Sequence, residues 1–153
     1  MPNNNFKQLR KDIIFEETLR GRSLRFHTTW GLFNPKRIDP GSHLLIDYLE
    51  TRPADRCLDL GCGYGPLGLT LAHLCLEGEV HLIDKDFVAV EYAAQNAERN
   101  GFANCRAYLS NGFSHVPAHM RFDTIVSNLP AKVGNELLTL IMHDACDRLE
   151  PGG

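Results

Sequence analysis

The chain has 153 residues, of which 43% are hydrophobic, and its formal net charge is −3. This length suits one domain with a single core, no apolar run approaches the roughly 20 residues of a membrane span, and residues 1–5 do not resemble a signal peptide. The five cysteines form no C-x-x-C pair and the seven histidines no metal-ligand spacing, so the sequence predicts a reduced, cytoplasmic protein without a metal site.

Charge is distributed unevenly along the chain. Residues 1–37 hold eight Lys or Arg and three acidic residues, a net charge of +5, whereas residues 38–153 hold eight basic and sixteen acidic residues, a net charge of −8. We therefore predict a basic extension at 1–37 ahead of a second unit at 38–153. Aromatic residues interleaved in the extension favour contact with a nucleic-acid backbone, although a solvated surface with its aromatics turned to the core fits composition equally well.

The first part of the chain predicts short strands followed by a short helix. β-branched and aromatic residues surround one Gly-containing turn, which favours a hairpin, and a later Asp-Pro-Gly-Ser run is a helix cap. In order, we expect a frayed start at 1–10, strands at 12–19 and 23–28 joined by a turn at 20–22, a loop at 31–35, and a helix at 43–49 capped from 39–42.

The remainder alternates buried-type strands with helices. This alternation predicts right-handed crossovers and an α/β fold, a Rossmann-like parallel sheet with helices on both faces. The expected elements are a strand at 56–60, a helix opened by Pro66, a strand at 79–84, a helix at 87–100 capped by Asp86 and ended by Gly101, strands at 105–109 and 122–127, and a helix capped by Asn135 that runs to about 149.

The turn after the strand at 56–60 is the clearest sign of a ligand site. Alternate glycines at 61, 63 and 65 allow a sharp bend and leave bare backbone for a bulky ligand. The G-x-G-x-x-G match at 63–68 makes a dinucleotide a formal candidate. Asp59 favours a different ligand, because a carboxylate repels a pyrophosphate and attracts a cationic amino-acid group. The interpretation that we favour least is that these glycines serve packing alone and bind no ligand.

Distinctive residues follow four of the predicted strands. The carboxyl ends of parallel strands share one edge of a sheet, which is where ligands of open α/β sheets bind. Each feature alone has a plainer explanation as a helix cap, a turn, a core aromatic or a strand end, but their convergence favours a ligand crevice. The residues are Asp59 with Gly61 and Gly63, Asp84 with Lys85, Asn111 with Gly112 and Phe113, and Asn128 with Leu129 and Pro130.

Residues 59–65, D-x-G-x-G-x-G, resemble the first motif of class I S-adenosylmethionine-dependent methyltransferases. Nearly the whole chain is similar to the small-methyltransferase domain family, which includes small-subunit ribosomal RNA guanine-N2 methyltransferases and stand-alone archaeal relatives. Residues 24–45 resemble the segment of that family that packs over the cofactor. Residues 83–85, 110–113 and 127–130 resemble its ribose-binding, adenine-facing and Asn-Pro-Pro motifs.

The resemblance implies S-adenosylmethionine as the cofactor and a role for each matched residue. Asp59 would help hold the methionine end, Asp84 the ribose, Asn111 the adenine amino group and Phe113 the adenine face. The implied cofactor-binding residues are Asp59, Gly61, Gly63, Asp84, Lys85, Asn111, Gly112 and Phe113, and the implied catalytic residues are Asn128, Leu129 and Pro130.

Two departures from the family pattern stand out. The Asn-Pro-Pro motif and its following aromatic residue are replaced by Asn-Leu-Pro-Ala at 128–131, so no ring at position 131 can stack on a base. The class also continues through a fifth parallel strand and an antiparallel hairpin, and we expect these C-terminal strands to be missing from the present sequence.

These observations predict an N-methyltransferase that acts on a guanine exocyclic amine of ribosomal RNA. Asn128 and the Leu129 carbonyl would accept the amine hydrogens and align the nitrogen lone pair with the methyl group. Three alternatives stay open: methylation of a protein amide or a small molecule, a catalytically silent cofactor-binding module, and a nicotinamide-dependent oxidoreductase.

Overall fold

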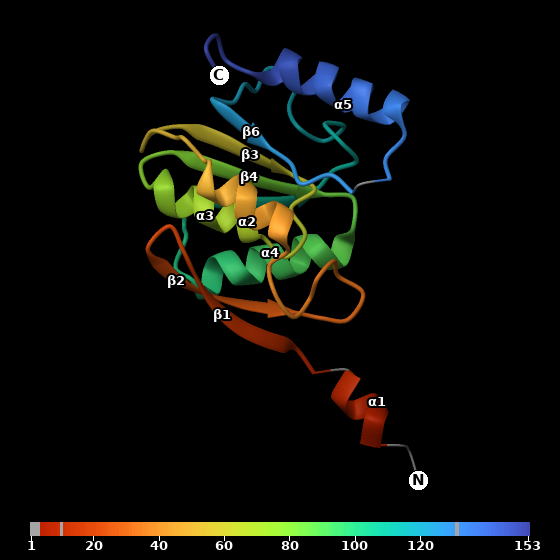
Figure 1. Cartoon of the computed structure of the whole chain (residues 1–153). Coiled ribbons are helices and arrows are strands. Elements are labelled where there is room, and N and C mark those ends of the chain that lie inside the picture. The colour runs from red at the N-terminus through yellow and green to blue at the C-terminus, as the bar shows by residue number, and fades with distance from the viewer. Residues whose placement is uncertain (1–3, 10, 131) are drawn as a thin grey trace.

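The computed structural model describes residues 4–9, 11–130 and 132–153. Its centre is a parallel sheet with strand order β5-β4-β3-β6 (Figure 1). Each strand is paired in parallel with its neighbour, so all the carboxyl ends lie at one edge. The strands are β3 (Arg56–Leu60), β4 (Glu79–Asp84), β5 (Cys105–Leu109) and β6 (Thr124–Val126).

The predicted bounds of β3, β4 and β5 are confirmed, whereas β6 is shorter than the expected strand at 122–127. Phe122, ahead of β6, forms an isolated parallel bridge with Leu149, which follows the last helix. Its N–H donates to the Arg148 carbonyl and its own carbonyl accepts from the Glu150 N–H, both at 2.8 Å. The next residue, Asp123, still donates its N–H to the Arg56 carbonyl of β3 at 2.8 Å.

Helices cover both faces of the sheet, as predicted. Side chains alternate along a strand, so neighbouring residues of β3 enter different cores: Cys57 packs toward α3 (Pro66–Leu74) and α4 (Phe87–Arg99), and Leu58 packs toward the opposite face. On that opposite face Phe122 is fully buried, and Ile141 and Ala145 of α5 (Asn135–Arg148) pack against the same cluster. The Rossmann-like arrangement is confirmed.

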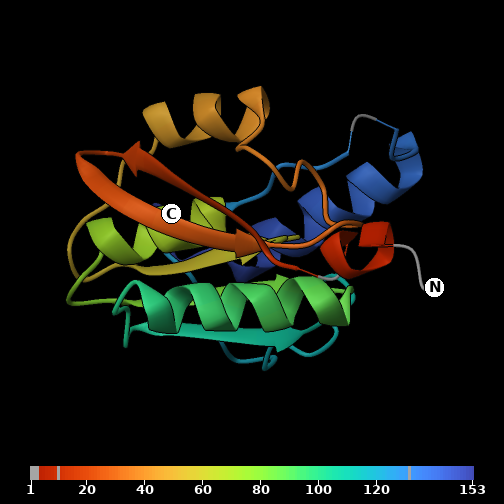
Figure 2. The same ribbon diagram turned by 90° about the horizontal axis from the view of Figure 1, so that it is seen from below.

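A hairpin of β1 (Ile13–Leu19) and β2 (Arg22–Thr28) precedes α2 (Pro40–Asp47). In Figure 2 the hairpin lies between α2 and α4. Its turn contains two residues, Arg20 and Gly21, both with positive φ, which suits the twist of a tight hairpin. Arg22 belongs to β2 and pairs with Leu19, so the expected three-residue turn was wrong by one residue.

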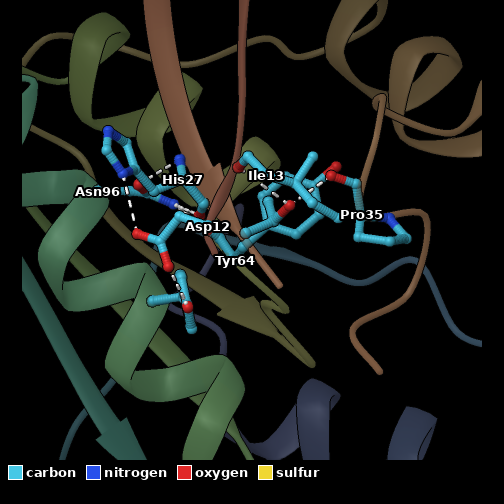
Figure 3. A network of polar contacts seen from close by, with 8 residues as sticks. Asp12, Ile13, His27, Pro35, Tyr64 and Asn96 are labelled. Carbon is cyan, nitrogen blue, oxygen red and sulfur yellow. Dashed lines mark hydrogen bonds and ion pairs between the residues drawn. The ribbon is translucent and has the colours of Figure 1, made fainter. Parts of the chain in front are cut away.

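Asn96 of α4 and Asn100, the C-cap of that helix, attach the hairpin by its backbone. Asn96 accepts from the His27 N–H and donates to the His27 carbonyl, both at 2.9 Å, and Figure 3 shows this pair beside Tyr64. One turn later Asn100 forms the same pair with the N–H and carbonyl of Arg25. The two side-chain amides therefore bond the backbone at the edge of β2, where a neighbouring strand would otherwise bond. They tie the hairpin firmly to α4.

Three helices differ from the sequence prediction, one in its existence and two in their bounds. Residues 4–9 form a short helix, α1, where a frayed start was expected, because Lys7, Gln8 and Leu9 are good helix formers; residues 1–3 and 10 lie outside the described part. Helix α2 begins at Pro40, directly after its cap Asp39, and ends at Asp47, so both ends of the helix expected at 43–49 were wrong. Helix α5 begins with Asn135 itself, and Gly134 stands at the cap position with extended backbone. The predicted end of α4 near Gly101, with φ of 77°, is confirmed.

Candidate active site

The carboxyl edge of the sheet brings the predicted site segments together. It faces right in Figure 1, where the loops after β3, β4, β5 and β6 meet the N-terminal ends of the helices. Parallel pairing of β5, β4, β3 and β6 places the last residues of all four strands on this edge. The predicted convergence of the four segments is therefore confirmed.

The glycine loop, residues 61–65, presents open backbone. Gly61 and Gly63 have φ of 74° and 55°, and a Cβ on either would meet nothing within 4 Å among the described residues. The loop is nevertheless fixed, because the N–H groups of Gly61 and Cys62 both donate to the Ile83 carbonyl at 2.8 and 2.9 Å. Glycine is needed here for the backbone conformation, and it leaves room for a group to lie against the main chain.

Asp59 lies beneath this loop and is only 1% exposed. Its Oδ2 accepts from the Gly68 N–H at 2.8 Å, while Oδ1 is buried without a hydrogen-bond partner in the described part of the chain. Burial raises the pKa of Asp59 to about 7, partly offset by the Gly68 bond and increased by the nearby Asp84 charge. The site therefore holds a buried carboxyl group that forms no ion pair with a Lys, Arg or His of the described residues.

Asp84 joins β4 to the glycine loop. Its Oδ2 accepts from the Gly63 N–H and its Oδ1 from the Asp86 N–H, both at 3.0 Å. Asp86 in turn caps α4 by accepting from the Val88 N–H at 2.9 Å, as predicted. Lys85, between the two aspartates, is exposed. Asp84 is half-buried, so part of its carboxylate remains accessible at the edge.

The loop after β5 has one exposed and one buried candidate. Asn111 is exposed, and Ser110 organises the turn by donating to the Gly112 carbonyl at 2.7 Å. Phe113 is 6% exposed and packs in the core cluster under α5, with the Arg148 guanidinium 5.6 Å from its ring centroid. Its environment is that of a core side chain, and its contact with an adenine face stays a prediction.

Asn128, two residues after the end of β6, is held by its amide nitrogen. Nδ2 donates to Asp39 Oδ2 at 2.9 Å and to Ser42 Oγ at 3.0 Å. Both amide hydrogens thus have acceptors, and within the described residues no donor is bonded to Oδ1. The side chain does not end its strand by bonding neighbouring backbone, which was the plainer interpretation of this residue.

The rest of the motif after β6 is more open. Leu129 is half-buried and Pro130 is exposed, and the Pro130 carbonyl accepts from the Val133 N–H at 3.2 Å in a turn. Ala131, where the family pattern has an aromatic residue, lies outside the described residues.

Asp39 and Ser42 were absent from the predicted set of site residues. Two sequence signals were present: the Asp-Pro-Gly-Ser run at 39–42, which was interpreted as a helix cap, and the resemblance of residues 24–45 to the segment of the family that packs over the cofactor. Asp39 does cap α2, accepting from the N–H groups of Gly41 and Ser42 at 3.0 and 3.2 Å. The same carboxylate also reaches Asn128, 89 residues away in sequence.

Two further features of the described ranges concern the class of protein. None of their helices is long and apolar enough to span a membrane. Their His, Cys, Asp and Glu side chains form no group of three or more arranged to hold a metal ion.

Comparison with known proteins places this geometry in context. Residues 23–153 match the family described as methyltransferase small domain. The uncharacterized protein YbxB of Bacillus subtilis is 38% identical over 136 residues, which are 88% of this chain and 68% of that protein. Ribosomal RNA small subunit methyltransferase C of Hahella chejuensis is 33% identical over 135 residues, covering 86% of this chain and 39% of that protein.

A solved structure agrees with the sequence comparison. The T. thermophilus 16S rRNA N2 G1207 methyltransferase RsmC, in complex with AdoMet and guanosine, matches 93% of this chain and 40% of its own, with a TM-score of 0.84 and 31% identity. The chain thus spans about two fifths of the length of these two ribosomal RNA methyltransferases. Together with the glycine loop and the polar edge of the sheet, the match over residues 23–153 shows that the chain belongs to the methyltransferase small domain family of S-adenosylmethionine-dependent enzymes.

Proposed function

We propose that this chain is an S-adenosylmethionine-dependent N-methyltransferase that acts on a guanine exocyclic amine of ribosomal RNA. The observation that carries the proposal is the state of Asn128, whose two amide hydrogens are bound by Asp39 and Ser42. This leaves its carbonyl oxygen available to accept a hydrogen from an amine. The related ribosomal RNA enzymes support RNA as the substrate class.

The residues at the edge fit the cofactor. The open backbone of Gly61 and Gly63 provides a surface for a bulky ligand, and the unpartnered Oδ1 of Asp59 lies beneath it. The negative charge of Asp59 favours the cationic methionine end over an anionic pyrophosphate. Asp84, at the end of β4, is half-buried and would accept from ribose hydroxyls.

The chemistry demands alignment more than acid or base assistance. When bound, S-adenosylmethionine would supply an activated sulfonium methyl group; the amine nitrogen would bond to this carbon as the carbon–sulfur bond breaks, with the electron pair going to sulfur and one amine proton to solvent. Asn128 Oδ1 and the Leu129 carbonyl would each accept one amine hydrogen. This holds the nitrogen lone pair in the direction of the methyl group, which is the contribution expected from a positioned acceptor pair.

The RNA-binding role expected for residues 1–37 requires revision. Arg20 donates to the carbonyls of Ile46 and Leu49, both at 2.9 Å, and Arg22 donates to the Asn100 carbonyl while lying over the Phe102 ring. These arginines attach the hairpin to α2 and α4. They are therefore poor candidates for free phosphate ligands.

The loop at 29–38 is the better RNA surface. Trp30 is 46% and Phe33 70% exposed, Lys36 and Arg37 are exposed beside them, and the segment contains no acidic residue. Lys36 Nζ lies 4.9 Å from the Trp30 ring centroid. Exposed rings that can stack on bases, next to cations that can meet phosphates, are typical of single-stranded RNA binding. The loop ends at Asp39, beside Asn128.

Transfer of a labelled methyl group tests the proposal directly. The chain is incubated with radiolabelled S-adenosylmethionine, unmodified small-subunit ribosomal RNA and total protein as separate fractions, and digestion to nucleosides then identifies the labelled product. We expect label in RNA as N2-methylguanosine, and none after omission of the chain. Label in the protein fraction alone would support the protein-amide alternative, which the non-aromatic Ala131 favours. An unlabelled result with measurable S-adenosylhomocysteine binding would support a silent binding module.

A further inference from the structure

The amide of Asn128 has two possible orientations, and only one is useful for catalysis. An amine to be methylated needs an acceptor, which is Oδ1, whereas Nδ2 would repel it. The two orientations differ by a half-turn about the last side-chain bond and have nearly the same shape. Packing alone therefore discriminates poorly between them, and the charges and hydrogen-bond partners around the amide must decide.

Asp39 makes that choice chemically. An ionised carboxylate only accepts hydrogen bonds, so Oδ2 of Asp39, 2.9 Å from the Asn128 amide, must face Nδ2. The reverse orientation would bring two oxygen acceptors together. Ser42 reinforces the choice, because its hydroxyl donates to Asp39 Oδ1 at 2.7 Å and its lone pairs accept the second Asn128 hydrogen.

The carboxylate is well suited to this task. Partial burial opposes its ionisation, but hydrogen bonds from Ser42 and Asn128 and from the backbone of Ser42 and Gly41 hold the pKa of Asp39 below its ordinary value. The cap also fixes its position relative to α2. A Cβ added at Gly41 would lie 3.0 Å from Asp39 Oδ2 and 3.2 Å from Asn128 Oδ1, so even this glycine keeps space free beside the pair.

We propose that Asp39 is a positioning residue that fixes the orientation of the Asn128 amide, so that Oδ1 is presented to the amine that is methylated. The proposal rests on the proposed function for its catalytic meaning. It assigns to the α2 cap a second task that helix stability does not require, since serine caps a helix about as well as aspartate.

A side-chain amide signal tests the orientation without any turnover. The full chain is labelled with ¹⁵N, and the Asn128 amide resonance is identified by its loss in Asn128→Ala. Asp39→Ser keeps a capping side chain but is too short and uncharged to hold Nδ2. We expect this variant to shift the resonance and to speed exchange of its hydrogens about tenfold, as one charge-assisted bond is removed. An unchanged signal in Asp39→Ser overturns the proposal.

Turnover on ribosomal RNA tests the catalytic consequence. We expect Asp39→Ser to lower kcat by about tenfold or more, with unchanged S-adenosylhomocysteine affinity, and to have no further effect in an Asn128→Ala background, where no amide remains to be oriented. A similar loss in both backgrounds would show that Asp39 acts only through α2, and would overturn the positioning role. Asp86→Ser, at the matched cap of α4, controls for capping itself.

The two proposals can fail separately. If the wild-type chain places no methyl group on RNA while the Asn128 resonance responds to Asp39→Ser, the proposed substrate is wrong and the orientation stands. If RNA is methylated and the resonance ignores Asp39→Ser, the substrate stands and the orienting role of Asp39 is wrong.

Discussion

Asp84 Oδ2 accepts a hydrogen bond from the Gly63 N–H at 3.0 Å, across 21 residues of sequence. The end of β4 and the open glycine loop are therefore held in a fixed relation. A ligand that lies on the loop and reaches Asp84 meets two parts of one preformed surface. This relation makes the carboxylate both a support for the loop and a candidate ligand-binding group.

Removal of the Asp84 carboxylate should weaken cofactor binding. We expect Asp84→Asn to reduce S-adenosylhomocysteine affinity by about tenfold or more, because charge-assisted hydrogen bonds contribute roughly 1.5–3 kcal/mol. Calorimetry of both the variant and wild type gives the comparison. Asp86→Asn removes the same charge two residues away and retains the α4 cap, so it should bind nearly as wild type does. Equal losses of affinity in the two variants would show that any nearby negative charge has this effect, and would contradict a direct contact between Asp84 and the ligand.

Binding should depend on pH through Asp59. Its pKa of about 7 in the free chain lies above the unfolded value, so ionisation is unfavourable in the fold, and stability from this group is present below about pH 4 and declines as pH rises through 7. The cationic α-ammonium group of the ligand favours the ionised form. We therefore expect S-adenosylhomocysteine affinity to fall about tenfold from pH 8 to pH 6, with proton release on binding below pH 7.

Titration calorimetry in buffers of different ionisation enthalpy measures that proton release. Asp59→Asn is the matched variant, since it keeps the size of the side chain and an oxygen for the Gly68 N–H. Its affinity should vary little between pH 6 and pH 8. A wild-type affinity as flat as that of the variant would contradict the assignment.

Asn128→Ala should impair methyl transfer and spare cofactor binding. The change removes an acceptor that matters chiefly when the amine is aligned, so kcat and kcat/KM should fall together while S-adenosylhomocysteine affinity stays the same. Leu129→Pro retains the backbone carbonyl and should be mild by comparison. Initial rates on ribosomal RNA provide the measurement. A less stable Asn128→Ala chain with normal turnover per folded molecule would point to a purely structural residue.

The loop at 29–38 should contribute to RNA affinity. We expect Trp30→Ala and Phe33→Ala each to weaken binding of single-stranded ribosomal RNA by about 1–3 kcal/mol if its ring stacks on a base. Lys36→Ala and Arg37→Ala should instead reduce the salt dependence, by about 0.7 in the logarithmic slope for each phosphate that is no longer neutralised. Fluorescence titrations at several salt concentrations separate the two effects. Arg20→Ala should chiefly lower stability, because its guanidinium serves backbone carbonyls.

Asn96→Ala should be strongly destabilising. Asn96 is fully buried and bonds the N–H and carbonyl of His27 and the Tyr64 carbonyl, so truncation leaves one buried and two part-buried backbone groups without this partner. We expect a loss of about 2–4 kcal/mol in urea unfolding. Asn100→Ala frees the more exposed groups of Arg25, which can turn to water, and should cost less. Similar midpoints for Asn96→Ala and wild type would contradict this account.

The strands and the edge of the sheet could be predicted because their signals are local. Buried apolar runs that end in an acid or a polar turn give β4 and β5 their observed bounds, and the glycine pattern gives the loop. The partnership of Asp39 with Asn128 could not be predicted, because a capping aspartate looks the same whether or not a distant amide meets it. Phe113 was ambiguous for a similar reason: a phenylalanine suits a core and a ligand pocket equally well.

Asn96 and Asn100 hold β2 through hydrogen bonds to backbone groups of the hairpin, and not to its side chains. Outward side chains on that strand, such as Ser23 and Arg25, are exposed and do not hold it in place by their own packing. Mutations at these positions can therefore accumulate without detaching the hairpin from α4. The buried Leu24 and Phe26 and the Arg22 side chain add to this attachment, so the freedom to vary is confined to the outward positions of β2.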